Sequence, residues 1–267
     1  MRYIGAAGIL LGLSLAMCSC SKQSTPSQNL VSQNQTPAQS LITHEAYKSP
    51  ADLLAQDIAE QRQNIALRKL IRGDTKRRWI ALTFDDGPHP NYTPKIVAIL
   101  RQHNVRATFF VVGKMAEKYP NLVRLLQASG MEIGNHTYDH VNLTKLNEGA
   151  IAAEIERCGE VIRRITGSQP TLFRPPGGDY NPTVARVAER LGYWMVLWTD
   201  DPGDYAQPPE SVLRRRLFTN ISNGGVILLH DGVSETVNLL PQLIENLHKE
   251  GYEIVPVGEM IPKPPTP

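Results

Sequence analysis

The sequence predicts an α/β protein whose parallel strands form a distorted, incomplete barrel of the (β/α)7 type. Short runs rich in β-branched and aromatic residues alternate with helical stretches, which is typical of βα units that build a parallel sheet. No glycine-rich dinucleotide loop follows the first strand, which disfavours a doubly wound nucleotide-binding sheet. Five of the seven apolar runs end in reactive side chains, and in α/β barrels the chemistry gathers at the carboxyl ends of the strands.

The first part of the chain does not have the composition of a folded domain. Residues 1–19 combine Arg2 with a short apolar stretch, the pattern of an export signal. The letters "AMCSC" resemble the end of a bacterial lipoprotein signal, with Cys20 as the lipidated residue and an ordinary secretory signal as the alternative. Residues 20–49 are rich in Ser, Gln, Asn, Thr and Pro, which predicts a disordered tether. We therefore expect an exported protein that a lipid anchors to the membrane of the bacterial cell envelope, or that is otherwise secreted.

The next segment predicts an ancillary helix over residues 50–73. Ser49 is a suitable cap, Pro50 suits the first turn, and Gly73 is a suitable stop. The apolar residues between them follow the helical period imperfectly. We therefore expect this helix to dock on the main domain or to form a stalk.

The main domain is predicted to span residues 74–260, followed by a Pro-rich tail over 261–267. Its expected strands are residues 79–84, 107–113, 131–136, 171–176, 193–198, 225–230 and 252–257. Its expected helices are residues 94–103, 147–167, 181–192, 210–221 and 235–251, several of which end at a glycine.

The amino-acid composition indicates a globular protein with a hydrophobic core and disfavours nucleic-acid binding. With 41% hydrophobic residues, the chain has ample material for a core. A formal net charge of +2 lacks the cationic excess that nucleic-acid binding needs, so no nucleic-acid partner is expected. Cleavage before Cys20 would leave Cys158 as the free thiol candidate, which excludes a disulfide framework and makes the core the source of stability. We assume a monomer.

Two neighbouring carboxylates, Asp85 and Asp86, end the first predicted strand in "ALTFDDGPHP". Two carboxylates this close raise each other's pKa unless a cation lies nearby or the two side chains have separate roles. "NHTYDH" supplies His136 and His140, and this spacing lets two imidazoles face one metal ion if the segment turns. Two imidazoles and one carboxylate leave positions for water and substrate, which is the arrangement of a hydrolytic metal site. The second carboxylate could then serve as a base.

The motifs "TFDDGP", "HTYDH", "RPPGG", "DPGDY" and "LLHD" resemble, in order and approximate spacing, the five motifs of the polysaccharide deacetylase family, carbohydrate esterase family four. The resemblance covers about residues 79–257. It implies a distorted (β/α) barrel that removes N-acetyl, sometimes O-acetyl, groups from chitin-like, peptidoglycan or xylan substrates. It also implies one divalent metal ion. Two histidines and an aspartate suit Zn2+, with Co2+, Mn2+ or Ni2+ as alternatives.

The resemblance implies a role for each matching residue. The implied catalytic residues are Asp85, the general base; Arg174, which would orient it; His230, the general acid; and Asp204, which would raise the pKa of His230. The implied metal ligands are Asp86, His136 and His140, with Thr137 bracing the loop between the histidines. The resemblance also implies that Leu228 lines the acetyl pocket. Apart from the resemblance, the backbone N–H of Gly177 is our candidate donor to the oxyanion, and Tyr205 and Tyr180 are candidates for stacking on sugar rings.

The chain departs from the family pattern at two positions. Gly177 stands where the third motif usually has tyrosine, and Tyr205 stands where the fourth usually has tryptophan. Both changes reduce the aromatic surface that lines the expected substrate groove. We expect them to affect the preference for substrate and not the chemistry of the reaction.

The sequence thus predicts a metal-dependent hydrolase that removes N-acetyl groups from N-acetylglucosamine polymers in the cell envelope. An O-acetyl esterase on xylan or another acetylated glycan is the alternative within the enzymes. A catalytically silent glycan-binding module is the alternative of another class. It is disfavoured because the base, the metal ligands and the acid are all present.

Overall fold

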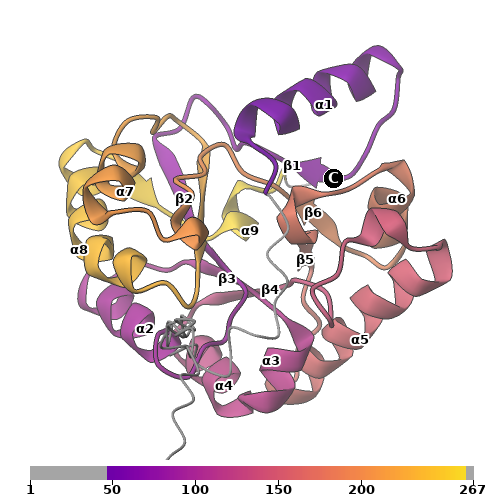
Figure 1. Ribbon diagram of the computed structural model, residues 1–267, viewed down its shortest axis with the longest axis horizontal. Coiled ribbons are helices and arrows are strands. Elements are labelled where there is room, and N and C mark those ends of the chain that lie inside the picture. The colour runs from indigo at the N-terminus through magenta and orange to yellow at the C-terminus, as the bar shows by residue number, and fades with distance from the viewer. Residues whose placement is uncertain (1–46, 263–267) are drawn as a thin grey trace, which may run out of the picture. The chain divides into compact units, whose positions relative to one another are not determined.

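Parallel strands and the helices that connect them make up residues 47–262, the part of the chain that the computed structural model describes (Figure 1). These residues belong to one unit of the chain. The predicted signal, the lipidation site Cys20 and the predicted tether up to residue 46 lie outside the described residues. Within residues 47–262, no helix has both the length and the apolar character needed to span a membrane.

The strands form an all-parallel sheet in the order β1-β6-β5-β4-β3-β2-β7, and β8 pairs with the first residues of β2. The strands are β1 (Lys69–Leu70), β2 (Trp79–Asp85), β3 (Thr108–Val111), β4 (Glu132–Asn135), β5 (Leu172–Phe173), β6 (Trp194–Val196), β7 (Gly225–His230) and β8 (Glu253–Ile254). Each of the seven predicted runs coincides with one of the strands β2 to β8. The two-residue strand β1 was not predicted.

The sheet curls into a distorted, incomplete barrel, which confirms the predicted fold class. After β6, the backbone N–H groups of Thr199 and Asp200 both donate to the carbonyl of Val226 in β7. The N–H of Leu228 donates in turn to the carbonyl of Asp200. The gap in the barrel is therefore bridged by a few hydrogen bonds beyond the end of β6, not by a regular strand.

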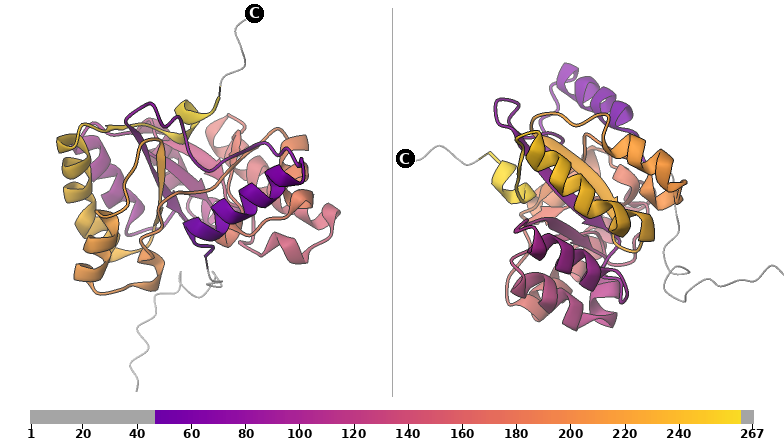
Figure 2. Two further views of the ribbon diagram at one scale, coloured as in Figure 1. Left: turned by 90° about the horizontal axis from the view of Figure 1, so that it is seen from above. Right: turned by 90° about the vertical axis from the view of Figure 1, so that its left-hand side faces the viewer.

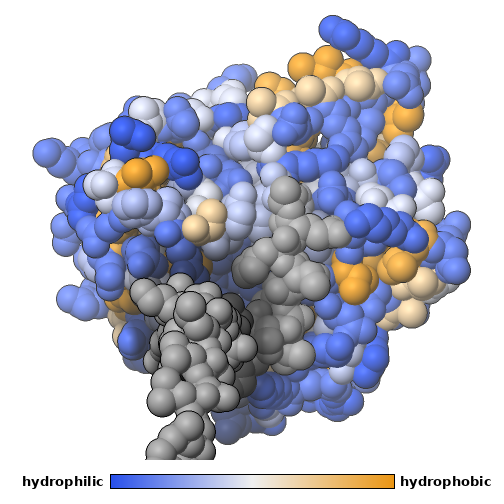
Figure 3. All heavy atoms as spheres, viewed as in Figure 1, coloured by the Kyte–Doolittle hydropathy of each residue, from blue (hydrophilic) through white to orange (hydrophobic). Residues whose placement is uncertain are grey.

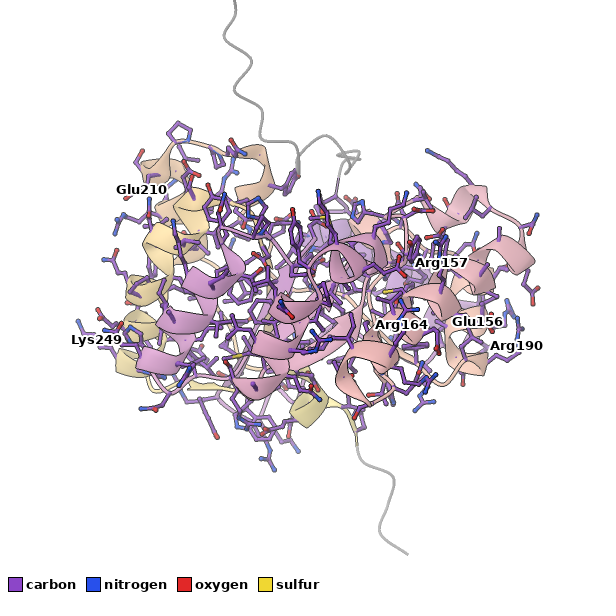
Figure 4. The ribbon with its side chains drawn as sticks, turned by 90° about the horizontal axis from the view of Figure 1, so that it is seen from below. Glu156, Arg157, Arg164, Arg190, Glu210 and Lys249 are labelled. Atoms are coloured by element: carbon purple, nitrogen blue, oxygen red, sulfur yellow. The ribbon has the colours of Figure 1, made fainter. Side chains whose placement is uncertain are left out.

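Helices surround the sheet (Figure 2). They are α1 (Pro50–Arg62), α2 (Thr93–Gln102), α3 (Gly113–Lys118), α4 (Pro120–Ala128), α5 (Glu148–Thr166), α6 (Pro182–Arg190), α7 (Glu210–Leu217), α8 (Ser234–Lys249) and α9 (Val257–Met260), with short 3-10 turns η2 (Leu143–Lys145), η3 (Pro176–Gly178) and η4 (Asp204–Ala206). The five predicted helices correspond to α2, α5, α6, α7 and α8. Figure 4 shows Arg190 of α6 and Lys249 of α8 at opposite outer edges, as expected for helices that turn charged faces to the solvent.

Buried apolar side chains fill the interior of the barrel and the space between the sheet and the helices. Phe84 of β2 stacks on Phe109 of β3 with ring centroids 4.9 Å apart, and both are fully buried. Cys158 of α5 is a free cysteine, as predicted, and its side chain is fully buried in the core. Burying each large apolar side chain contributes about 1.5–3 kcal/mol, so this core supplies the stability that disulfides do not.

The ancillary helix is shorter than predicted, because α1 ends at Arg62 instead of reaching residue 73. Asn64 adopts a left-handed φ of 56°, and the N–H of Ile65 donates to the carbonyl of Glu60. The chain then forms β1, which pairs with β6. The predicted stop at Gly73 was therefore wrong, because the segment leaves the helix early to join the edge of the sheet.

The helix α1 lies beside β1 in Figure 1, and polar side-chain contacts attach it to the barrel. The ammonium of Lys69 contacts the carboxylate of Glu60, lies 2.8 Å from Asp57 Oδ1, and donates to the Tyr180 hydroxyl over 2.9 Å. We call these four residues the α1 clasp. Leu53, on the same helix, is fully buried in the core, whereas Leu54 and Ile58 are exposed. Figure 3 shows hydrophobic atoms at the surface in the region of α1.

Candidate active site

The predicted catalytic and metal-binding residues meet at the carboxyl ends of the strands. Asp85 ends β2 and is in register with His230, which ends β7. His136 directly follows β4, and Arg174 directly follows β5. Because all these strands are parallel, their carboxyl ends lie at one edge of the barrel, so the four side chains converge.

Asp86, His136 and His140 form a cluster that could hold a metal ion. One donor atom from each residue lies within 4.8 Å of the other two, and all three residues are buried. Asp86 Oδ1 lies 3.1 Å from His140 Nε2 and 3.4 Å from His136 Nε2. Two ligand atoms at tetrahedral corners around Zn2+ would be about 3.3 Å apart, given bonds of 2.0–2.1 Å. The separations therefore fit a shared divalent ion.

The hydrogen bonds around the cluster leave its inner atoms without partners. His136 Nδ1 lies 2.8 Å from the Arg174 carbonyl, so Nδ1 carries the proton and Nε2 presents a lone pair. Asp86 Oδ1, His136 Nε2 and both ring nitrogens of His140 are buried and have no hydrogen-bond partner among the described residues. Buried polar atoms are rarely left unpaired, so a cation that accepts these lone pairs fits the cluster.

Charge also favours this arrangement. Burial alone would raise the pKa of Asp86, but the imidazoles of His140 and His136 outweigh burial and hold the pKa of Asp86 well below its usual range. The carboxylate is therefore ionised near neutral pH, as a metal ligand must be.

The backbone around the ligands adopts uncommon conformations. Asp86, Thr137 and His140 have φ values of 71°, 65° and 56°, in the left-handed region that side chains other than glycine rarely adopt. Thr137 Oγ1 accepts from the His140 N–H over 3.1 Å, and Asn135 Oδ1 accepts from the Thr137 N–H over 2.9 Å. Thr137 thus has the bracing position predicted for it, and these bonds hold a strained loop that aims both imidazoles at Asp86.

Asp85 is fully buried and is held by Arg174. Arg174 Nη1 donates to Asp85 Oδ1 and to Thr83 Oγ1, each over 2.8 Å. Its Nε and Nη2 donate to the carbonyls of Val196 and Leu197. Burial lowers the pKa of Arg174, and the carboxylate of Asp85 partly offsets this change. Asp85 Oδ2 has no hydrogen-bond partner and points to the cluster, 3.7 Å from His136 Nε2.

His230 is oriented by Asp204. His230 Nδ1 lies 2.6 Å from Asp204 Oδ1, while Asp204 Oδ2 accepts from the His230 N–H over 2.8 Å and from Thr236 Oγ1 over 2.6 Å. Burial lowers the pKa of His230, but the carboxylate of Asp204 more than compensates and raises it to about 9. The imidazole is therefore protonated at neutral pH, and its unpartnered Nε2 is the atom that can donate a proton.

The predicted substrate-binding residues separate into two groups. Gly177, with φ of 64°, lies in the turn after Arg174, and the Tyr205 ring lies 5.4 Å from the His230 ring. Leu228 is fully buried on β7, two residues before His230. Tyr180 does not join them, because its hydroxyl belongs to the α1 clasp.

Tyr47 lies in the site although the sequence placed it in the disordered tether. Its hydroxyl lies 3.4 Å from Asp86 Oδ2, and its ring lies 4.7 Å from the ring of His230 and 4.5 Å from that of Tyr205. Burial and the carboxylates of Asp86 and Asp85 raise the pKa of Tyr47 well above its usual value, so the hydroxyl is protonated and donates to Asp86. In the sequence, the only hint of this position was that Tyr47 is an aromatic residue two positions before Ser49, the predicted helix cap.

The fold and the site together define a hydrolase built on a parallel α/β barrel, with carboxylates and imidazoles at the strand ends. Comparisons with known proteins also indicate a hydrolase of this kind. The polysaccharide deacetylase family model matches residues 72–196. A peptidoglycan-N-acetylglucosamine deacetylase of Bacillus cereus is 38% identical over 187 residues, which cover 68% of this chain and 87% of the relative. The chain therefore belongs to the polysaccharide deacetylase family.

Solved structures show the same architecture. The crystal structure of the Bc1960 peptidoglycan N-acetylglucosamine deacetylase is similar, with a TM-score of 0.72 and 33% identity over 76% of this chain and 95% of that chain. A CE4 family pseudoenzyme from Bacillus anthracis is also similar, with a TM-score of 0.71 and 26% identity over 75% of this chain and 71% of that chain. The fold is thus shared by active and inactive relatives, which makes the side chains of the site decisive.

Proposed function

We propose that this protein is a metal-dependent deacetylase that removes N-acetyl groups from N-acetylglucosamine-containing polysaccharide, with peptidoglycan as the favoured substrate. One observation carries the proposal. The proposed base, the metal ligands and the proposed acid are all buried, and each presents an unpartnered polar atom. The names of the Bacillus cereus relative and of the Bc1960 structure support peptidoglycan as the glycan.

The base side of the reaction follows from Asp85. A divalent ion held by Asp86, His136 and His140 would polarise the acetyl carbonyl and acidify the attacking water. Asp85 Oδ2 is unpartnered and adjacent to these ligands, so it can accept the proton of the water that attacks the carbonyl carbon. Arg174 binds Oδ1, which leaves Oδ2 for this task. The backbone N–H of Gly177 is the proposed donor to the oxyanion, and one such donor typically stabilises the transition state by about 3–4 kcal/mol.

The acid side follows from His230. The tetrahedral carbon collapses to acetate only when the C–N bond breaks, and an amine leaves poorly unless it is protonated. His230 Nε2 can supply that proton, because Asp204 holds Nδ1 and keeps the ring cationic. An alkoxide leaves more easily than an amine anion. The pairing of His230 with Asp204 therefore favours N-acetyl over O-acetyl groups, and the esterase remains the alternative.

The assay of this proposal is acetate release from peptidoglycan and from acetylated chitooligosaccharides, with Zn2+ or Co2+ added. We expect release by the wild type, loss of release on metal removal with a chelator, and restoration when the metal returns. His140→Ala removes one of three ligands and should weaken Zn2+ binding, measured by calorimetric titration, and abolish release. No release of acetate by the metal-loaded wild type from either substrate would refute the proposal and favour a silent glycan-binding module.

Replacing Asp204 with Asn should shift the alkaline limb of the pH profile to lower pH. His230 must be protonated to donate, so activity is present below its pKa and is lost as pH rises through about 9. In this variant the carboxylate of Asp204 no longer raises the pKa of His230, whereas burial still lowers it, so the pKa falls. The measurement is kcat as a function of pH for acetate release. Thr236→Val is the matched control, because it removes a bond to Asp204 but keeps the carboxylate, and its alkaline limb should stay in place.

The proposed place of action is the cell envelope. This follows from the export signal and lipidation motif that residues 1–20 resemble, and it stays a prediction because those residues lie outside the described part of the chain. The metal also stays open among Zn2+, Co2+, Mn2+ and Ni2+, since a carboxylate and two imidazoles bind all four.

A further inference from the structure

The residues immediately before α1 cross the active site. We call Tyr47, Lys48 and Ser49 the strap. The Tyr47 hydroxyl reaches Asp86, and its ring packs edge-on against His230 with centroids 4.7 Å apart. Lys48 continues the strap over the turn after β5, where its N–H donates to the Gly177 carbonyl over 2.9 Å. One side chain thus contacts both a proposed metal ligand and the proposed general acid.

The position of Tyr47 conflicts with substrate. The acetamide must be attacked beside Asp85 and Asp86, and its nitrogen must reach His230 Nε2. That atom is buried and unpartnered while Tyr47 and Tyr205 pack against its ring. We therefore propose that the strap is an autoinhibitory segment, and that Tyr47 plugs the active site until the polysaccharide displaces it. This inference rests on the proposed deacetylase function and adds its regulation.

The contacts of the strap suit a plug that can leave. The bond from Tyr47 to Asp86 is long, at 3.4 Å, and therefore weak. The ion pair between Lys48 Nζ and Asp179, 3.8 Å apart, is partly exposed, and such pairs contribute about 0–1 kcal/mol. The Ser49 side chain instead caps α1 in a capping box with Asp52. On the side of the site, the ring contacts of Tyr47, one backbone hydrogen bond and these two weak polar contacts hold the strap, whereas Ser49 attaches it firmly to the helix.

The helix that carries the strap is firmly anchored. Leu53 is fully buried, and the α1 clasp joins the last turns of α1 to β1 and to Tyr180. Because α1 stays in place, a displaced strap remains tethered next to the site and can return after product leaves. Removal of the plug therefore raises the fraction of molecules that can accept substrate.

The test is Tyr47→Ala in the full chain, assayed on acetylated chitooligosaccharides. An apparent affinity falls in proportion to the fraction of competent molecules, so a strap closed in about nine of ten molecules lowers kcat/KM about tenfold. We expect Tyr47→Ala to raise kcat/KM about tenfold and Tyr47→Phe to stay near wild type, because it keeps the ring. Lys48→Pro deletes the N–H donor to Gly177 and should raise kcat/KM by less. Leu54→Ala, an exposed position on α1, is the control that leaves activity unchanged.

A second readout does not depend on catalysis. Diethylpyrocarbonate modifies accessible imidazoles in their neutral form, and Asp204, which raises the pKa of His230, is present in both proteins. At one fixed pH, peptide mass spectrometry of the metal-free protein reports the rate at His230 relative to the exposed His248. We expect His230 to react about tenfold faster in Tyr47→Ala than in the wild type. Equal rates at His230 in the two proteins would overturn the plug, and so would a fall of kcat/KM in Tyr47→Ala. If no variant releases acetate, the deacetylase function fails, and the modification rates alone decide whether the strap closes the site.

Discussion

Replacing Asp85 with Asn is expected to lower kcat/KM for deacetylation by about 10²–10⁴-fold, the usual contribution of a general base. The amide of Asn has nearly the shape of the carboxylate and can still accept from Arg174 Nη1, which donates to Asp85 Oδ1 over 2.8 Å. It cannot accept the proton of the attacking water. The measurement is the initial rate of acetate release under metal saturation.

The control for this variant is metal affinity. Asp86, His136 and His140 are unchanged in it, so calorimetric titration should give Zn2+ binding close to that of the wild type. A variant that binds Zn2+ normally but is inactive would assign the loss to proton transfer. Asp85→Asn with kcat/KM within a few-fold of wild type would contradict the role of Asp85 as the base.

Replacing Arg174 with Met is expected to lower the free energy of unfolding by about 3–5 kcal/mol, the usual effect of removing one partner of a buried ion pair. Arg174 and Asp85 are both fully buried, so the variant leaves a carboxylate without its counterion inside the barrel. Thr83 Oγ1 and two backbone carbonyls lose their donor at the same time. Urea denaturation of the metal-free protein measures the change.

A double variant separates the ion pair from general packing. In Asp85→Asn with Arg174→Met, no charge is left unpaired at either position. The loss of unfolding free energy should therefore be smaller than the sum of the two single losses. Additivity within about 0.5 kcal/mol would show that the two side chains do not stabilise each other.

The strands and the reacting side chains could be predicted from the sequence, because each depends on a pattern of residues within a short stretch of the chain. An apolar run with β-branched and aromatic residues, such as the one that ends at Asp85, forms a strand through local preference and burial, and the parallel sheet brings its end next to His136 and His230. Asp204 pairs with His230 as the resemblance implied, since η4 presents its carboxylate to the end of β7.

The features that were missed depend on contacts between distant segments. Residues 69–70 form a strand because they pair with β6, more than a hundred residues later, and two residues carry too little pattern to reveal this pairing. Tyr180 was expected to face the substrate, but Glu60 and Lys69 bind its hydroxyl. Tyr47 lies in a polar segment with no periodic pattern, and its order comes from the rings of His230 and Tyr205.

Arg174 connects the two halves of the centre through different parts of one residue. Its carbonyl accepts from His136 Nδ1 and so fixes which nitrogen faces the metal cluster. Its guanidinium fixes which oxygen of Asp85 is free. A change that displaces Arg174 would thus disturb the tautomer of His136 and the orientation of Asp85 at the same time. The metal ligand His136 and the proposed base Asp85 therefore depend on the position of this one residue.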